Sequence, residues 1–90
     1  MATAVDVRVS GRVQGVSFRA YAEREALRLG VAGWVRNEPD GSVAGHFEGD
    51  PVAVAAMVDW CRAGPRLARV QRVVTRAGTV TGATTFGVRY

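Results

Sequence analysis

The sequence predicts an α+β domain in which one antiparallel sheet carries two helices on one face and ends in a short extra strand. Two segments have apolar residues at helical spacing, and each is flanked by segments in which apolar and polar residues alternate. The resulting element order is βαββαβ, followed by one more strand. Ninety residues, 48% of them hydrophobic, are enough for one core but not for two. We therefore expect a single domain over residues 1–90.

The first predicted strand covers residues 5–10, in which valines alternate with polar residues. A loop over residues 11–17 joins it to a helix over residues 18–29. Ser17 occupies the N-cap position, so we expect the loop to end in unpaired backbone N–H groups that point out of the helix start. Gly30 follows the helix at the position that favours a left-handed residue.

A hairpin is predicted next, with strands over residues 31–37 and 42–48. The turn over residues 38–41 contains proline, aspartate and glycine in the order of a type I turn with a glycine bulge. We expect Trp34 to lie in the core, with Gly33 beside it permitting close packing.

The second helix is bounded by Asp50-Pro51, a cap followed by an N1 proline, and by Gly64-Pro65. Its buried face is expected to carry Val54, Met57, Val58 and Cys61.

A fourth strand is predicted over residues 67–76, with a bulge at Val73-Val74. A glycine- and threonine-rich connection over residues 78–85 leads to a short fifth strand over residues 86–90. This order is that of the ferredoxin-like sandwich. In that topology the first two strands run parallel and the third lies between them, so their carboxyl ends share one end of the sheet.

The loop over residues 11–17 has the features of an anion site. N–H groups at a helix start attract anions, Gly15 lets the backbone approach closely, and Arg19 adds a charged donor fork. Asn37 ends the second strand, two strand spacings or about 10 Å from the root of the loop. We therefore expect Arg19 and Asn37 to face one small anionic ligand.

Two motifs are similar to the signatures of acylphosphatases. These are GRVQGVSFR at residues 11–19 and GWVRNEPDGSV at residues 33–43, and FGVRY at residues 86–90 is similar to the usual ending of that family. The resemblance covers nearly the whole chain. It implies that water hydrolyses the carboxyl–phosphate anhydride of an acyl phosphate to carboxylate and inorganic phosphate, without a metal or another cofactor.

The resemblance also implies roles for particular residues. Asn37 would orient the attacking water. The substrate phosphate would be bound by Arg19 and by the loop backbone of Gln14, Gly15, Val16, Ser17 and Phe18. Because a carboxylate is a good leaving group, positioning and charge stabilisation remain as the main tasks. An amide is no base at neutral pH, so the proton of the water goes elsewhere, with the substrate's own phosphate as one candidate. Inorganic phosphate is expected to compete for the site.

Two alternative functions have to be considered, nucleic-acid binding and small-anion binding without turnover. All twelve basic residues are arginine, which excludes Schiff-base chemistry and the lysine of a nucleotide-binding P-loop. The net charge of +4 favours anionic partners, but the arginines are dispersed, and the inserted strand has one aromatic, Phe47, which is expected in the core. This argues against nucleic acid. A small-anion-binding domain without turnover is the second rival, against which Arg19 and Asn37 both argue.

Other catalytic groups are poorly placed. His46 is expected on the exposed sheet face and Cys61 on a buried helix face, so they do not form a nucleophilic pair. A zinc site lacks ligands, and Ser10, Ser17 and Ser42 have a single histidine to share. One cysteine, no signal peptide and no long apolar segment predict a cytoplasmic protein without a membrane anchor, which we expect to be a monomer.

Overall fold

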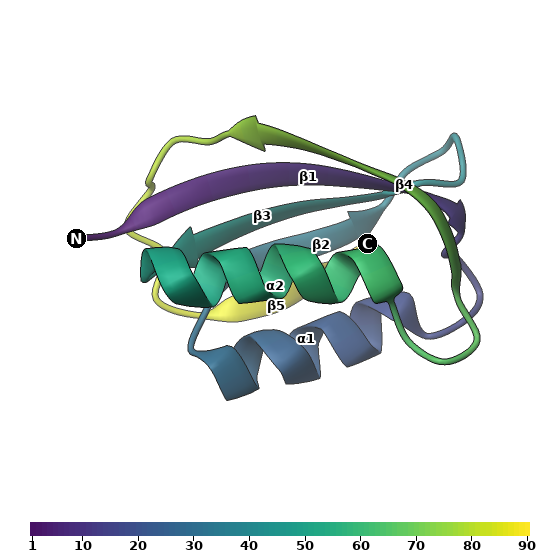
Figure 1. Cartoon of the computed structure of the whole chain (residues 1–90), viewed down its shortest axis with the longest axis horizontal. Coiled ribbons are helices and arrows are strands. Elements are labelled where there is room, and N and C mark those ends of the chain that lie inside the picture. The colour runs from purple at the N-terminus through teal and green to yellow at the C-terminus, as the bar shows by residue number, and fades with distance from the viewer.

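Two helices cover one face of a single five-stranded sheet (Figure 1). The computed structural model describes residues 1–90. Its elements in chain order are β1 (Thr3–Arg12), α1 (Phe18–Leu29), β2 (Ala32–Asn37), β3 (Val43–Gly49), α2 (Pro51–Ala63), β4 (Arg69–Ala77) and β5 (Phe86–Arg89). The predicted element order and the predicted layers are confirmed. No helix has the length and apolar character needed to cross a membrane.

The strands are ordered β4-β1-β3-β2-β5 across the sheet. As predicted, β3 lies between β1 and β2 and is antiparallel to both, so β1 and β2 run in the same direction. The added strand β5 is the exception in this antiparallel sheet, because it pairs with β2 in parallel at the sheet edge. The reason is the direction of β4, which ends beside the start of β1. The chain therefore enters β5 at the end of the sheet where β2 also begins.

The bulge in β4 lies elsewhere than expected. Val73 and Val74 are in regular register with β1. The register shifts instead between Ser10 and Gly11, leaving Gln71 of β4 without a partner in β1. A Cβ at Gly11, whose φ is +122°, would lie 2.1 Å from a backbone oxygen of β4. Glycine thus permits the close backbone approach at the shift.

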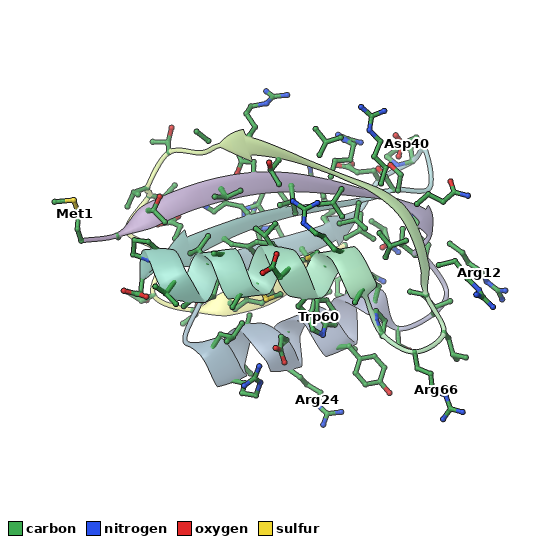
Figure 2. The ribbon with its side chains drawn as sticks, viewed as in Figure 1. Met1, Arg12, Arg24, Asp40, Trp60 and Arg66 are labelled. Atoms are coloured by element: carbon green, nitrogen blue, oxygen red, sulfur yellow. The ribbon has the colours of Figure 1, made fainter.

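The core fills the space between the sheet and the helices. Phe18 from α1 and Phe47 from β3 are fully buried, and Phe18 also packs on Trp60 of α2 with ring centroids 5.2 Å apart. Truncating either phenylalanine to alanine is expected to cost about 3–5 kcal/mol of stability. Polar side chains are directed away from this core, as Arg12 and Arg66 show in Figure 2.

Trp34 does not lie in this core, contrary to expectation. Side chains of a strand alternate between faces, and Val35 takes the buried side. Trp34 therefore lies half-buried on the helix-free face, with the guanidinium groups of Arg36 and Arg89 at 5.0 and 4.7 Å from its ring centroid. The prediction for Gly33 is confirmed, since a Cβ there would lie 1.7 Å from a backbone oxygen of β3.

Candidate active site

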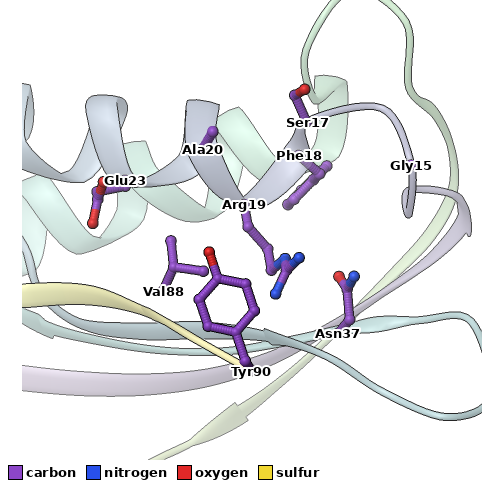
Figure 3. A pocket seen from close by; sticks show the side chains of 9 residues that line it. All are labelled: Gly15, Ser17, Phe18, Arg19, Ala20, Glu23, Asn37, Val88 and Tyr90. Atoms are coloured by element: carbon purple, nitrogen blue, oxygen red, sulfur yellow. The ribbon is translucent and has the colours of Figure 1, made fainter.

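A hollow of about 620 Å³ opens where β1 and β2 end and α1 begins. Four segments line it: the loop after β1, the first turns of α1, the end of β2 and the C-terminus (Figure 3). The lining residues are Gly15, Ser17, Phe18, Arg19, Ala20, Glu23, Asn37, Val88 and Tyr90.

Arg19 and Asn37 line this hollow together, as the topology predicted. Arg19 comes from the first turn of α1, and Asn37 is the last residue of β2. In Figure 3 the Arg19 guanidinium group lies between the Asn37 side chain and the Tyr90 ring. The two side chains can therefore contact a single small ligand.

The C-terminal segment positions Arg19. Its Nη1 donates a hydrogen bond to the backbone oxygen of Arg89 at 3.1 Å, and its guanidinium carbon lies 4.6 Å from the centroid of the Tyr90 ring. This contribution of β5 was not predicted from the sequence. The alternation of Phe86, Val88 and Tyr90 indicates a strand at the end of the chain. It does not indicate that this strand pairs with β2, which is what brings its end beside Arg19.

The loop before α1 presents a run of free donors. The backbone N–H groups of residues 14–18 donate no hydrogen bond to any backbone or side-chain acceptor in the structure. Gly15 has a φ of +73° and Ser17 a φ of 61°, so the chain turns through two left-handed residues within three positions. Consecutive N–H groups in such turns form a concave site for an anion.

The side chains of two loop residues, Gln14 and Val16, are directed away from the hollow. The Val16 side chain is buried in the core. Gln14 Nε2 donates hydrogen bonds of 2.8 Å to the backbone oxygens of Glu38 and Ser42, which fastens the loop to the turn between β2 and β3. Neither residue lines the hollow with its side chain, and the bracing by Gln14 was not predicted.

Ser17 is the N-cap residue of α1, as predicted, but its conformation is unusual. Ser17 does precede α1, but its side chain makes no capping hydrogen bond, and its left-handed backbone departs from the extended conformation of an ordinary N-cap. Asp50 before α2 behaves as predicted, because its carboxylate accepts hydrogen bonds from the N–H groups of Val52 and Ala53.

His46 lies on the helix-free face of the sheet as predicted, but it is buried rather than exposed. Its Nδ1 lies 2.6 Å from Asp6 Oδ1, and its Nε2 lies 2.5 Å from Glu48 Oε2. Burial alone would lower the pKa of His46, but the hydrogen bonds to these two carboxylates outweigh it and raise the pKa above 6.5. The Thr81 hydroxyl and the His46 ring hold the pKa of Glu48 at about 2.

Cys61 lies on the buried face of α2, as predicted. Burial raises the pKa of its thiol to about 12, so the thiolate is scarce at neutral pH. Because His46 is on the other side of the sheet, the two side chains do not form a nucleophilic pair.

The family model and the curated relatives agree on one family. A family model described as Acylphosphatase matches residues 5–88. An acylphosphatase from a Nocardioides species is 71% identical over 89 residues, which covers 99% of this chain and 90% of that protein. The structure of an acylphosphatase from Coxiella burnetii is similar at a TM-score of 0.94 and 34% identity, covering 98% of this chain and 93% of that one. An acylphosphatase from Bacillus subtilis gives 0.94 and 32%, with both chains fully covered.

Proposed function

Because the chain belongs to the acylphosphatase family, it hydrolyses the carboxyl–phosphate anhydride of acyl phosphates, and we propose that the hollow at the start of α1 is the active site. The observation that carries this proposal is that Arg19 and Asn37 line the same hollow. The loop beside them offers the free backbone N–H groups of residues 14–18. Residues 1–90 would then act as one catalytic domain.

In this proposal the phosphoryl group is bound by the Arg19 guanidinium and by the backbone N–H groups of Gln14, Gly15, Val16, Ser17 and Phe18. These groups supply positive charge and fixed donors where negative charge spreads over the phosphoryl oxygens in the transition state. The support lies in the loop backbone, whose N–H groups are unpaired and which turns through two left-handed residues, a conformation typical of anion sites.

Asn37 would orient the attacking water. Its side-chain amide both donates and accepts hydrogen bonds, so it can hold a water with one lone pair free for phosphorus. It cannot remove the proton, and the phosphate oxygens of the substrate are the nearest acceptors that the reaction itself supplies. The carboxylate leaves without a strong general acid, and no metal is needed to supply charge that Arg19 and the amides already provide.

We further propose that the protein acts as a cytoplasmic monomer on small molecules, with inorganic phosphate as product and competing ligand. Its single cysteine suits a reducing compartment. The helix-free face offers one large aromatic, Trp34, already flanked by two guanidinium groups, whereas RNA-binding sheets stack two or three bases on several aromatics. Nucleic acid is therefore a poor fit to this face.

The test is release of inorganic phosphate from benzoyl phosphate in the presence of EDTA. Arg19→Ala and Asn37→Ala are each expected to lower kcat/KM by about 10²–10³ or more, because each removes a preorganised group. Arg24→Ala is a matched control on the same helix outside the hollow, and it should stay within about twofold of wild type. Circular dichroism checks that every variant is folded.

If both site variants still hydrolyse benzoyl phosphate, the active site lies elsewhere in the protein. A folded wild type that binds phosphate but does not hydrolyse benzoyl phosphate would instead be an anion-binding domain.

A further inference from the structure

The hollow is larger than a phosphate requires, and its remaining part has a composition of its own. In Figure 3, Asn37 and Gly15 lie at one end, the Arg19 guanidinium lies in the middle, and Glu23 lies at the opposite end. We call the part beyond Arg19 the acyl arm. It is lined by Ala20, Glu23, Val88 and Tyr90.

We propose that the acyl group of the substrate occupies this arm and that Glu23 determines which acyl groups are accepted. Neutral and cationic acyl groups are favoured, and those that carry a second negative charge are disfavoured. This inference rests on the proposed function, because it takes Arg19 as the phosphoryl-binding group and Asn37 as the group that orients the water.

The direction of the acyl group follows from the geometry of phosphoryl transfer. The attacking and leaving oxygens lie roughly in line on opposite sides of phosphorus. With the water held by Asn37 at one end and the phosphoryl group bound by Arg19 in the middle, the leaving carboxylate oxygen faces the acyl arm. The acyl chain attached to that oxygen then extends over Val88 and Tyr90 toward Glu23.

The acyl arm suits a small organic group. Ala20 contributes only a methyl group from α1, while Val88 and the Tyr90 ring supply apolar surface from the C-terminal segment. An apolar wall with few polar groups is the usual lining of a site for an organic ligand.

Glu23 sets the charge of the arm. Its side chain is partly buried and takes part in none of the ion pairs or side-chain hydrogen bonds of the structure. Arg19 is the one cationic side chain that lines the hollow, and a bound phosphate would use its charge. A second anionic group on the substrate would therefore meet an uncompensated carboxylate. A free amino group would be attracted to it.

Three substrates that differ only at the far end of the acyl group provide the test. They are benzoyl phosphate, 4-carboxybenzoyl phosphate and 4-(aminomethyl)benzoyl phosphate, each corrected for its uncatalysed hydrolysis. In Glu23→Gln, the kcat/KM for the carboxy substrate relative to benzoyl phosphate is expected to rise about three- to tenfold. The same ratio for the aminomethyl substrate is expected to fall by a similar factor.

Asp59→Asn is the matched control. It removes the same charge from the protein, but Asp59 lies on α2 and does not line the hollow. Both substrate ratios should stay within about twofold of wild type in this variant, because the Asp59 carboxylate is exposed to solvent and salt screens its charge. In wild type, about 1 M salt shortens the screening length to about 3 Å and should reduce the discrimination between the charged substrates.

Substrate ratios that do not change in Glu23→Gln, or that change equally in Asp59→Asn, would overturn the role of Glu23. In that case the proposed function still stands if wild type hydrolyses benzoyl phosphate and Arg19→Ala does not. If wild type fails to hydrolyse benzoyl phosphate, the proposed function itself is overturned, and the inference with it.

Discussion

At the scale of single residues, the loop over residues 11–17 depends on backbone conformations that most residues avoid. Ser17 is the one non-glycine residue with a positive φ, and Gly15 has a φ of +73° two positions earlier. Left-handed backbone costs an L-residue roughly 1–2 kcal/mol, and such strain concentrates at functional sites. At Ser17 this conformation accompanies the run of free N–H groups rather than a capped helix start.

Alanine substitutions at two glycines distinguish the effect of backbone strain on stability from its effect on activity. Gly15 and Gly82 have φ values of +73° and +81°, and a Cβ at either position would meet open space. Alanine at each is therefore expected to reduce the free energy of unfolding by about 1 kcal/mol, as measured by urea denaturation. Only Gly15→Ala should also lower kcat/KM, by about tenfold or more, because small displacements of the loop amides misplace the phosphoryl group. Equal activity losses in the two variants would contradict this account of the loop.

At the scale of elements, the His46 cluster joins strands that are separate in sequence. His46 of β3 bridges Asp6 of β1 and Glu48 of β3. Glu48 in turn accepts hydrogen bonds of 3.0 and 3.1 Å from the N–H groups of Thr81 and Gly82. Those residues belong to the connection that leads into β5. The cluster thus fixes the segment that finally places Tyr90 beside Arg19.

The cluster predicts how stability depends on pH. Both ring nitrogens of His46 face carboxylates, so only the protonated ring satisfies both of them. The pKa of His46 is raised above 6.5 in the folded state. The contribution of His46 to stability is therefore fully present below pH 6.5 and is lost as pH rises through the raised pKa. Ionised Glu48 contributes to stability above pH 4.5, and this contribution is lost as pH falls toward its lowered pKa of about 2.

Urea denaturation of wild type and His46→Asn at about pH 5.5 and about pH 9 checks the histidine. The gap in the free energy of unfolding between the two proteins should be larger at the lower pH. A gap that is constant, or that widens at the higher pH, would show that the protonated ring is not what stabilises this face.

At the scale of the whole molecule, the order of the strands assembles the site. Because β3 separates two strands of the same direction, the loop after β1 and Asn37 at the end of β2 lie at one end of the sheet. This could be predicted from the sequence, since alternation and helical spacing identify each element and the element order suggests one common topology. That Arg19 and Asn37 lie at the same hollow then follows from the topology, without knowledge of any side-chain position.

Other features depend on contacts that local pattern does not encode. The parallel pairing of β5 follows from where β4 ends, and with it comes the role of Tyr90. His46 is buried among Asp6, Glu48 and the Trp34 ring, which come together only in the folded sheet, and alternation assigns only its face. At Ser17 the residue type suggests a cap, but the backbone conformation decides whether the side chain can reach the N–H groups.

Calorimetric titration with inorganic phosphate tests most directly whether Arg19 binds the phosphoryl group and Asn37 orients the water. We expect Arg19→Ala to weaken phosphate binding by about tenfold or more, because a charge-assisted bidentate contact is lost. In Asn37→Ala the Kd for phosphate should stay within about twofold of wild type while kcat falls by about 10²-fold or more. Phosphate binding that weakens equally in both variants, or that survives in Arg19→Ala, would contradict this division of roles.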